Sequence, residues 1–105
     1  MKFLETPTFT KIANQSLHDD EYRLLQMALV LRPEQGALIP GTGGLRKLRW
    51  SGKGHGKRGG YRVIYYWDRT SDAIYMLYLY PKNEQEDLTA QQTKILKQLV
   101  EREFN

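Results

Sequence analysis

Two β-prone runs joined by a short polar turn constrain the fold of this chain more than any other feature. YRVIYYW at 61–67 and AIYMLYLY at 73–80 are rich in aromatic and branched apolar residues, which favour strands. The intervening DRTSD has the composition of a turn. Together these segments predict an antiparallel hairpin over residues 61–80. Alternation within the first run predicts that Arg62, Ile64 and Tyr66 share one face of the sheet.

A third antiparallel strand is predicted over LRKLRW, residues 45–50, with Leu48 and Trp50 inward and Lys47 and Arg49 outward. Before it, LIPGTGG has the composition of a glycine-rich turn region. KFLE at residues 2–5 predicts one more short strand at the N-terminus.

Three helices are predicted around these strands. Pro7 permits a helix start, and the next helix runs from an N-cap at Asp19 or Asp20 to a stop at Pro33. The last helix is capped by Asp87 or Thr89. Its apolar stripe contains Leu88, Ile95, Leu96, Leu99 and Val100. The order is strand, two helices, three antiparallel strands and a helix. It predicts a single α+β domain over residues 1–105, with the helices on one side of a sheet.

Positive charge is concentrated in one segment, residues 46–62. The chain of 105 residues has a formal net charge of +4, yet this segment contains no Asp or Glu. Its seven cations are Arg46, Lys47, Arg49, Lys53, Lys57, Arg58 and Arg62. Such a patch attracts polyanions and steers their approach. Arg62 is the most informative cation, because it lies within an apolar and aromatic strand. It either pairs with an acid such as Glu84 or faces a cleft that receives an anion.

Several function classes are disfavoured by the composition. The chain has no cysteine, and His18 and His55 are far apart with no metal-ligand spacing, so no metal site or cofactor is expected. The stretch from Gly54 to Gly59 matches G-x-G-x-x-G formally, but a strand follows it where a dinucleotide site needs a helix. No apolar run approaches the length of a membrane span, so a cytoplasmic protein without a membrane partner is expected.

The residues alone therefore predict binding to RNA or DNA phosphates. Tyr61, Tyr65, Tyr66, Tyr78 and Tyr80 interleave with the cations, and one or two of them at a cleft edge would stack on bases. Cleavage is also chemically accessible, because RNA carries its own nucleophile in the 2′-OH. The protein then needs to supply positioning, proton transfer and charge stabilisation at the phosphate.

Three motifs together resemble the HigB-type branch of the RelE/ParE toxin superfamily. They are GTGGLRKLR at 41–49, GKRGGYR at 56–62 and KNEQEDL at 82–88. The resemblance extends over nearly the whole chain and implies a RelE-like fold. It also implies the toxin of a type II toxin–antitoxin pair, a ribosome-dependent endoribonuclease that cleaves mRNA in the A site without a metal ion. The implied partners are the ribosome, mRNA and a cognate antitoxin protein, and the toxin on its own is expected to be a monomer.

The resemblance also implies roles for individual residues. Arg62 matches the arginine that contacts the scissile phosphate, and Lys47 and Arg49 match a basic pair on the preceding strand. The implied catalytic set is Arg62, Lys57, Arg58, Lys82 and Glu84. The implied RNA-binding set is Arg46, Lys47, Arg49, Lys53 and His55. Asn83 and Thr89 stand where RelE itself has an arginine and a tyrosine, so Glu84, His55 and a lysine all stay candidates for the general acid and base.

Two other functions fit the same pattern. A ParE-like inhibitor of DNA gyrase would share the fold, and a non-catalytic ribosome- or RNA-binding module would share the basic patch. The cations on the strand and loop favour the ribonuclease, because inhibition of gyrase does not require a site that contacts phosphates.

Overall fold

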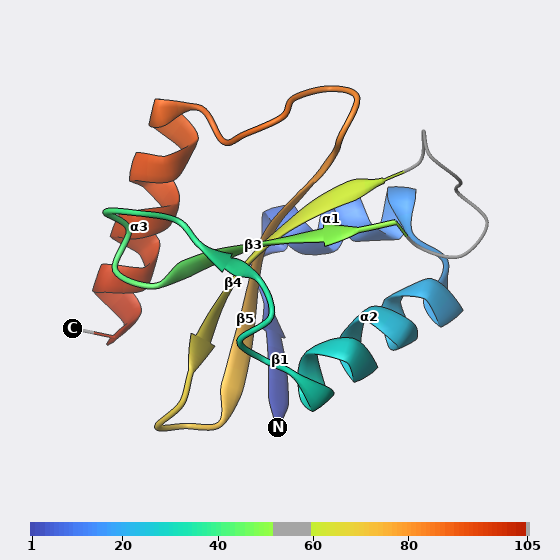
Figure 1. The fold of residues 1–105 in the computed structure, drawn as a ribbon, viewed down its shortest axis with the longest axis horizontal. Helices are drawn as coiled ribbons and strands as arrows, with labels where there is room; N and C mark the ends of the chain where they lie inside the picture. Colours follow the sequence, from blue (N-terminus) through green and yellow to red (C-terminus); the bar gives the residue numbers. More distant parts are fainter. Residues whose placement is uncertain (52–59, 105) are drawn as a thin grey trace.

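Five strands and three helices make up the computed structural model, which describes residues 1–51 and 60–104 (Figure 1). In chain order the elements are β1 (Lys2–Glu5), α1 (Pro7–Ser16), α2 (Asp19–Leu31), β2 (Ala37–Leu38), β3 (Leu45–Trp50), β4 (Tyr61–Asp68), β5 (Ala73–Pro81) and α3 (Ala90–Phe104). The predicted α+β class and the predicted order of helices and main strands are confirmed. No helix in the described parts of the chain is long and apolar enough to cross a membrane.

The sheet is mixed and has the strand order β1-β5-β4-β3-β2. The predicted antiparallel core of β3, β4 and β5 is confirmed, and β4 and β5 form the predicted hairpin. The N-terminal strand adds to this core in parallel beside β5, with Lys2 opposite Ala73. Residues Ala37–Leu38 pair with β3 at the other edge, although no strand was predicted there and Leu38 was placed in the glycine-rich turn region.

The helix ends follow local capping chemistry. α1 begins at Pro7, and the Thr6 hydroxyl accepts a hydrogen bond from the backbone N–H of Phe9 at 3.0 Å. The N-cap of α2 is His18, one residue before Asp19 and two before Asp20, the two predicted caps. The His18 backbone N–H donates to Glu21 Oε1 at 3.3 Å, so Asp19 and Asp20 lie in the first turn, where the helix dipole favours acids.

Thr89 is the residue that caps α3, which confirms one of the two predicted caps. Its hydroxyl accepts from the Gln92 backbone N–H at 3.0 Å. The other predicted cap, Asp87, lies two residues earlier and pairs with a lysine on the sheet instead. This difference matters for the candidate site.

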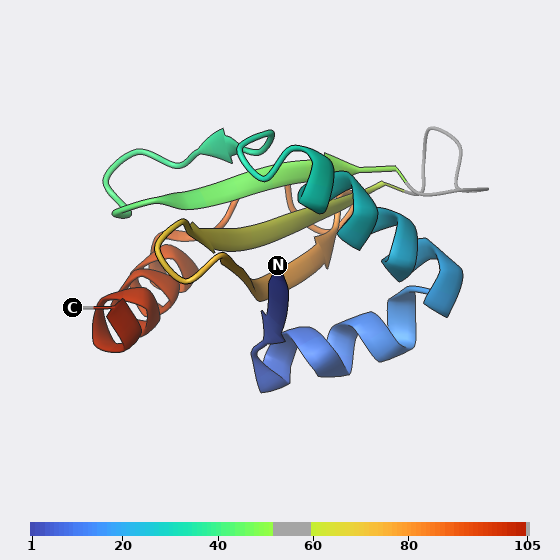
Figure 2. The same cartoon turned by 90° about the horizontal axis from the view of Figure 1, so that it is seen from below.

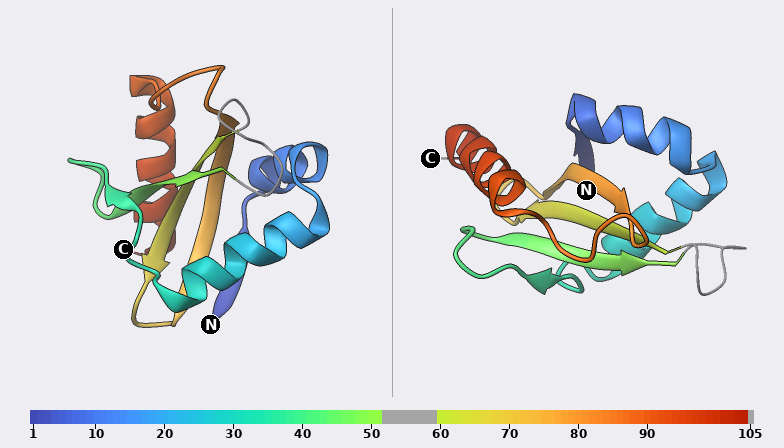
Figure 3. Two further views of the ribbon diagram at one scale, coloured as in Figure 1. Left: turned by 45° about the vertical axis from the view of Figure 1, so that its right-hand side comes forward. Right: turned by 90° about the horizontal axis from the view of Figure 1, so that it is seen from above.

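The helices cover both faces of the sheet, so the prediction that they lie on one side is wrong. α1 and α2 pack on a first core that includes Leu48, Val63 and Tyr65. α3 packs on a second core that includes Leu45, Ile64 and Leu77. Figures 1 and 2 show α3 on one side of the strands and α1 and α2 on the other, and both views in Figure 3 keep that separation. Val63 and Ile64 are adjacent in β4, and alternation buries each in a different core.

A bulge in the central hairpin and an exposed row on α2 complete the architecture. Ile64 pairs with Tyr78 and Tyr65 pairs with Met76, so Leu77 of β5 is the extra residue. On α2, the leucines Leu25 and Leu29 are fully buried. Four other apolar side chains of α2 are exposed: Leu24, Met27, Val30 and Leu31.

Candidate nucleic-acid interface

Strand alternation divides the cations of β3 between the two faces of the sheet. Leu45 belongs to the second core, so Lys47 and Arg49 lie on the same face as α3. Arg46 lies on the other face, where its Nη1 donates to the carbonyls of Glu34 and Gly36 at 2.7 and 2.8 Å. Arg46 therefore stabilises the segment before β2. The structure does not bring it together with Lys47 and Arg49, which lie on the opposite face of the sheet.

Arg62 lies at the centre of the α3 face of the sheet. It pairs with Arg49 on β3 and with Tyr80 on β5, so the side chains of these three residues line up across adjacent strands. Only 3% of Arg62 is exposed. Its Nη2 lies 3.2 Å from Glu86 Oε1, and its Nε has no hydrogen-bond partner within residues 1–51 and 60–104. The acid that pairs with Arg62 is therefore Glu86 and not Glu84.

The second ion pair of the site joins Lys47 to Asp87. Lys47 Nζ lies 2.5 Å from Asp87 Oδ1, and the lysine side chain is more buried than its partner. The hydrogen bond and charge of Lys47 lower the pKa of Asp87 below its ordinary value. Arg62 and Arg49 act on this carboxylate in the same direction from farther away. We call Lys47, Arg49 and Arg62 the basic cluster.

Tyr80 was one of five tyrosines that the sequence offered for stacking on bases, but the structure buries it beside Arg62. The residue is fully buried opposite Arg62, and its hydroxyl donates to the Glu86 carbonyl at 3.4 Å. Burial and the nearby Asp87 carboxylate raise its pKa to about 12, from an ordinary value of 10.0. The pairing of Tyr80 with Arg62 depends on the bulge at Leu77. No sequence pattern marks that bulge, so the sequence alone could not have placed Tyr80 beside Arg62.

Lys82 and Glu84 lie on the connection between β5 and α3. The Lys82 backbone N–H donates to the Gly60 carbonyl at 2.9 Å, which ties this connection to the start of β4. The side chains of Lys82 and Glu84 are exposed, and no salt bridge between described residues includes Glu84. Lys82 therefore flanks the basic cluster, whereas no contact of Glu84 with another described residue assigns it a chemical role.

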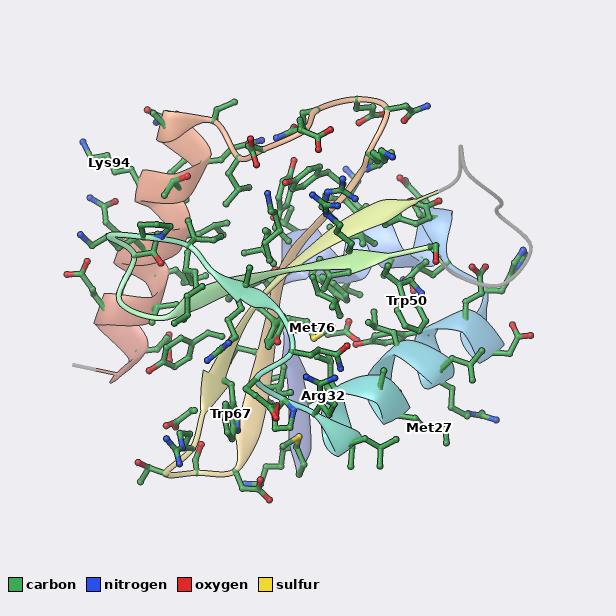
Figure 4. The ribbon with its side chains drawn as sticks, viewed as in Figure 1. Met27, Arg32, Trp50, Trp67, Met76 and Lys94 are labelled. Atoms are coloured by element: carbon green, nitrogen blue, oxygen red, sulfur yellow. The ribbon has the colours of Figure 1, made fainter. Side chains whose placement is uncertain are left out.

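The other predicted site residues lie outside the described part of the chain. They are Lys53, His55, Lys57 and Arg58. The strand ends beside them are described: Trp50 pairs with Tyr61, next to the pair formed by Arg49 and Arg62. Figure 4 shows Trp50 on the side of the sheet that carries α2, opposite to the face of the basic cluster. Within residues 1–51 and 60–104, no group of three or more His, Asp or Glu side chains could hold a metal ion.

The chemical character of the site follows from these contacts. A buried guanidinium and a partly buried ammonium pair with two exposed carboxylates, which are adjacent in sequence on the connection between β5 and α3. The cations are fixed on strands, and the carboxylates belong to a connection outside the sheet. Another anion can therefore take the place of a carboxylate beside its cation. Arginine suits a tetrahedral oxyanion such as a phosphate, because its donors form a rigid fork.

Comparison with known protein families agrees with this geometry. The whole chain, residues 1–105, matches the family described as the RelE toxin of the RelE/RelB toxin–antitoxin system. A match of this extent covers every helix and strand described above, together with the basic cluster. The chain belongs to the RelE toxin family.

Proposed function

We propose that this toxin is a ribosome-dependent, metal-independent mRNA endonuclease of the HigB type that inhibits translation in the cytoplasm. The observation that carries the proposal is Arg62, an almost fully buried guanidinium on a central strand, with further cations beside it. A permanent charge is costly to bury unless it meets an anion. Membership of the RelE family supports a toxin whose partners are an antitoxin and the ribosome.

In the proposed mechanism, Arg62 binds the scissile phosphate and stabilises the charge that develops during cleavage. Lys47 and Arg49 bind the neighbouring phosphates, and Lys82 with Lys53, Lys57 and Arg58 extends the cationic surface. The 2′-OH of the message attacks the adjacent phosphorus, and the bond to the 5′ oxygen breaks. Glu84, His55 and a lysine are the candidate proton-transfer groups. Tyr80 is not included among these groups, because it is buried and its hydroxyl already donates to the Glu86 carbonyl.

In this proposal the site does not itself align the 2′-OH with the phosphorus, and this is why cleavage depends on the ribosome. The cluster can bind and polarise a phosphate, but the 2′-OH must also be aimed at the phosphorus. Holding the message in a bent geometry can contribute about 7–11 kcal/mol when the alignment is near ideal. We propose that the ribosomal A site supplies this alignment.

The test is cleavage of one defined message in three settings: free in solution, on programmed ribosomes, and on programmed ribosomes with EDTA added only after the complexes form and at a concentration that leaves them intact. We expect cleavage only on the ribosome, with products that carry a 2′,3′-cyclic phosphate or 3′-phosphate and a 5′-hydroxyl. Rapid cutting of free RNA would contradict the proposal. Intact messages together with inhibited supercoiling by DNA gyrase would instead identify a gyrase inhibitor.

Arg62→Ala tests the residue that carries the proposal. Loss of one contact to the developing charge should slow ribosomal cleavage by about 100–1000-fold. Arg23→Ala is the matched control, because it removes an exposed cation from α2, on the other side of the sheet. Circular dichroism checks that both variants fold. A folded Arg62→Ala protein with undiminished cleavage would remove Arg62 from the mechanism.

A further inference from the structure

The two ion pairs of the site are unequal in burial. The Arg62 side chain is 4% exposed and the Lys47 side chain 23% exposed, whereas Glu86 is 64% and Asp87 71% exposed. The cations are therefore part of the sheet, and the carboxylates are surface groups laid over them. Exposed carboxylates lose little when they return to water.

The backbone of Glu86 and Asp87 is anchored independently of their carboxylates. The Tyr80 hydroxyl donates to the Glu86 carbonyl, and Gln85 Nε2 donates to the Asp87 carbonyl at 2.9 Å. Each side chain can therefore rotate away from its cation while the chain between β5 and α3 keeps its course. The carboxylates are adjacent in sequence, so one ligand that binds across both cations displaces them together.

The Arg62 fork is incompletely used by Glu86. A single contact joins Nη2 to Oε1, and Nε lies buried without a partner among the described residues. A phosphate presents more than one acceptor oxygen, so it can engage two donors of the same guanidinium. Glu86 leaves Nε without an acceptor among the described residues, so a phosphate that reaches both Nη2 and Nε would satisfy a donor that this carboxylate does not.

We infer that Glu86 and Asp87 are built-in competitors that occupy the phosphate positions of Arg62 and Lys47, and that they select for ligands with two neighbouring phosphates. This inference rests on the proposed function. Lys47 pairs with Ile64, two residues from Arg62 on β4, so the two cations are diagonal neighbours about 7–8 Å apart at Cα. A lone phosphate displaces one carboxylate and leaves the other pair closed. Adjacent phosphates of an RNA strand displace both.

The experiment measures binding of the isolated full chain to a fluorescent eight-nucleotide 2′-O-methyl oligoribonucleotide, which cannot be cleaved because its nucleophile is blocked. Glu86→Gln and Asp87→Asn should each tighten binding by about two- to fivefold, the range expected for loss of one exposed ion pair. Glu101→Gln is the matched control, since it removes one exposed negative charge from α3. In a variant that combines Glu86→Gln with Asp87→Asn, inorganic phosphate should compete with the oligonucleotide at concentrations that leave binding by the wild type unaffected.

Three results would overturn the inference. They are affinities equal to that of Glu101→Gln, no detectable binding by any variant, and weaker binding by Glu86→Gln, which would mean that Glu86 orients Arg62 for its ligand. The cleavage assay with ribosomes separates this inference from the proposed function. Cleavage by the wild type with unchanged binding in the variants refutes only the competitor role. Tighter binding in the variants without cleavage by the wild type refutes only the nuclease.

Discussion

At the candidate site, buried or partly buried cations pair with exposed carboxylates. The positive charge that a ligand meets therefore depends on whether these carboxylates stay in place. Arg62 is buried by its position on a central strand, and its carboxylate partner is supplied from a connection outside the sheet. The pair between Lys47 and Asp87 repeats this arrangement. Mutations of the two members of a pair should therefore have opposite effects on phosphate binding. Loss of the cation removes the proposed binding group, whereas loss of the acid leaves that cation free to bind.

The pair between Lys47 and Asp87 should contribute stability that depends on pH. Lys47 lowers the pKa of Asp87 in the folded protein, from an ordinary value of 3.8. Its contribution is present above that value and is lost as the pH falls through the lowered pKa. We expect Lys47→Met to raise the pKa of Asp87 in an NMR titration.

Thermal unfolding provides a second measure of this pair. The difference in Tm between the wild type and Lys47→Met should be present at neutral pH and should shrink as the pH falls below the ordinary carboxyl value. A difference that persists unchanged in strong acid would show that Lys47 stabilises the fold by packing and not through Asp87.

Single side chains also join elements that are distant along the chain, and Thr6 is the main example. Its hydroxyl accepts from the Phe9 N–H at the start of α1 and donates to the Leu77 carbonyl of β5 at 2.8 Å. Thr6→Ala removes a helix cap and leaves that carbonyl without its partner. We expect a loss of about 1–3 kcal/mol in the free energy of unfolding, measured with urea. Thr6→Ser keeps the hydroxyl and should recover most of the loss.

The turn between β2 and β3 tests why the GTGG motif contains glycine. Gly44 has a φ of +122°, and an added Cβ would lie 2.9 Å from the Tyr66 ring. Gly41 also has a positive φ, +74°, but open space surrounds the position of its Cβ. We expect Gly44→Ala to cost about 2–4 kcal/mol and Gly41→Ala about 1 kcal/mol in chemical denaturation. Equal losses would mean that the Tyr66 ring moves aside freely.

At the scale of the whole molecule, one sheet separates two cores and joins them into one folding unit. Ile64 is fully buried in the core under α3, whereas Trp50 and Trp67 pack against the core under α1 and α2. Ile64→Ala should destabilise the protein by about 2–5 kcal/mol. Tryptophan fluorescence on the far side of the sheet and far-UV circular dichroism should report the same midpoint. Separate midpoints would show that the two cores unfold independently.

Local pattern was sufficient for every helix and strand except the two-residue β2. The observed β4 and β5 exceed the predicted 61–67 and 73–80 by one residue each, and the helix stop before Pro33 is where proline chemistry places it. The concentration of cations in residues 46–62 is likewise a property of the sequence alone. These features depend on neighbours a few positions away, and such interactions are encoded within short segments.

The amino-acid sequence by itself therefore determined the helices, four of the five strands and the positive charge, and only the tertiary structure decided which of these meet and that Ala37–Leu38 pairs with β3. Alternation shows that Arg46 and Lys47 face opposite ways, but not that α3 covers the Lys47 side. Glu86 as the partner of Arg62, the place of β1 beside β5 and the contact of Tyr80 with the Glu86 carbonyl all depend on pairing across the sheet. Such contacts join segments that are distant in the chain. Competing acids and strands have the same local chemistry, so local pattern cannot choose between them, and the packing of both cores makes the choice.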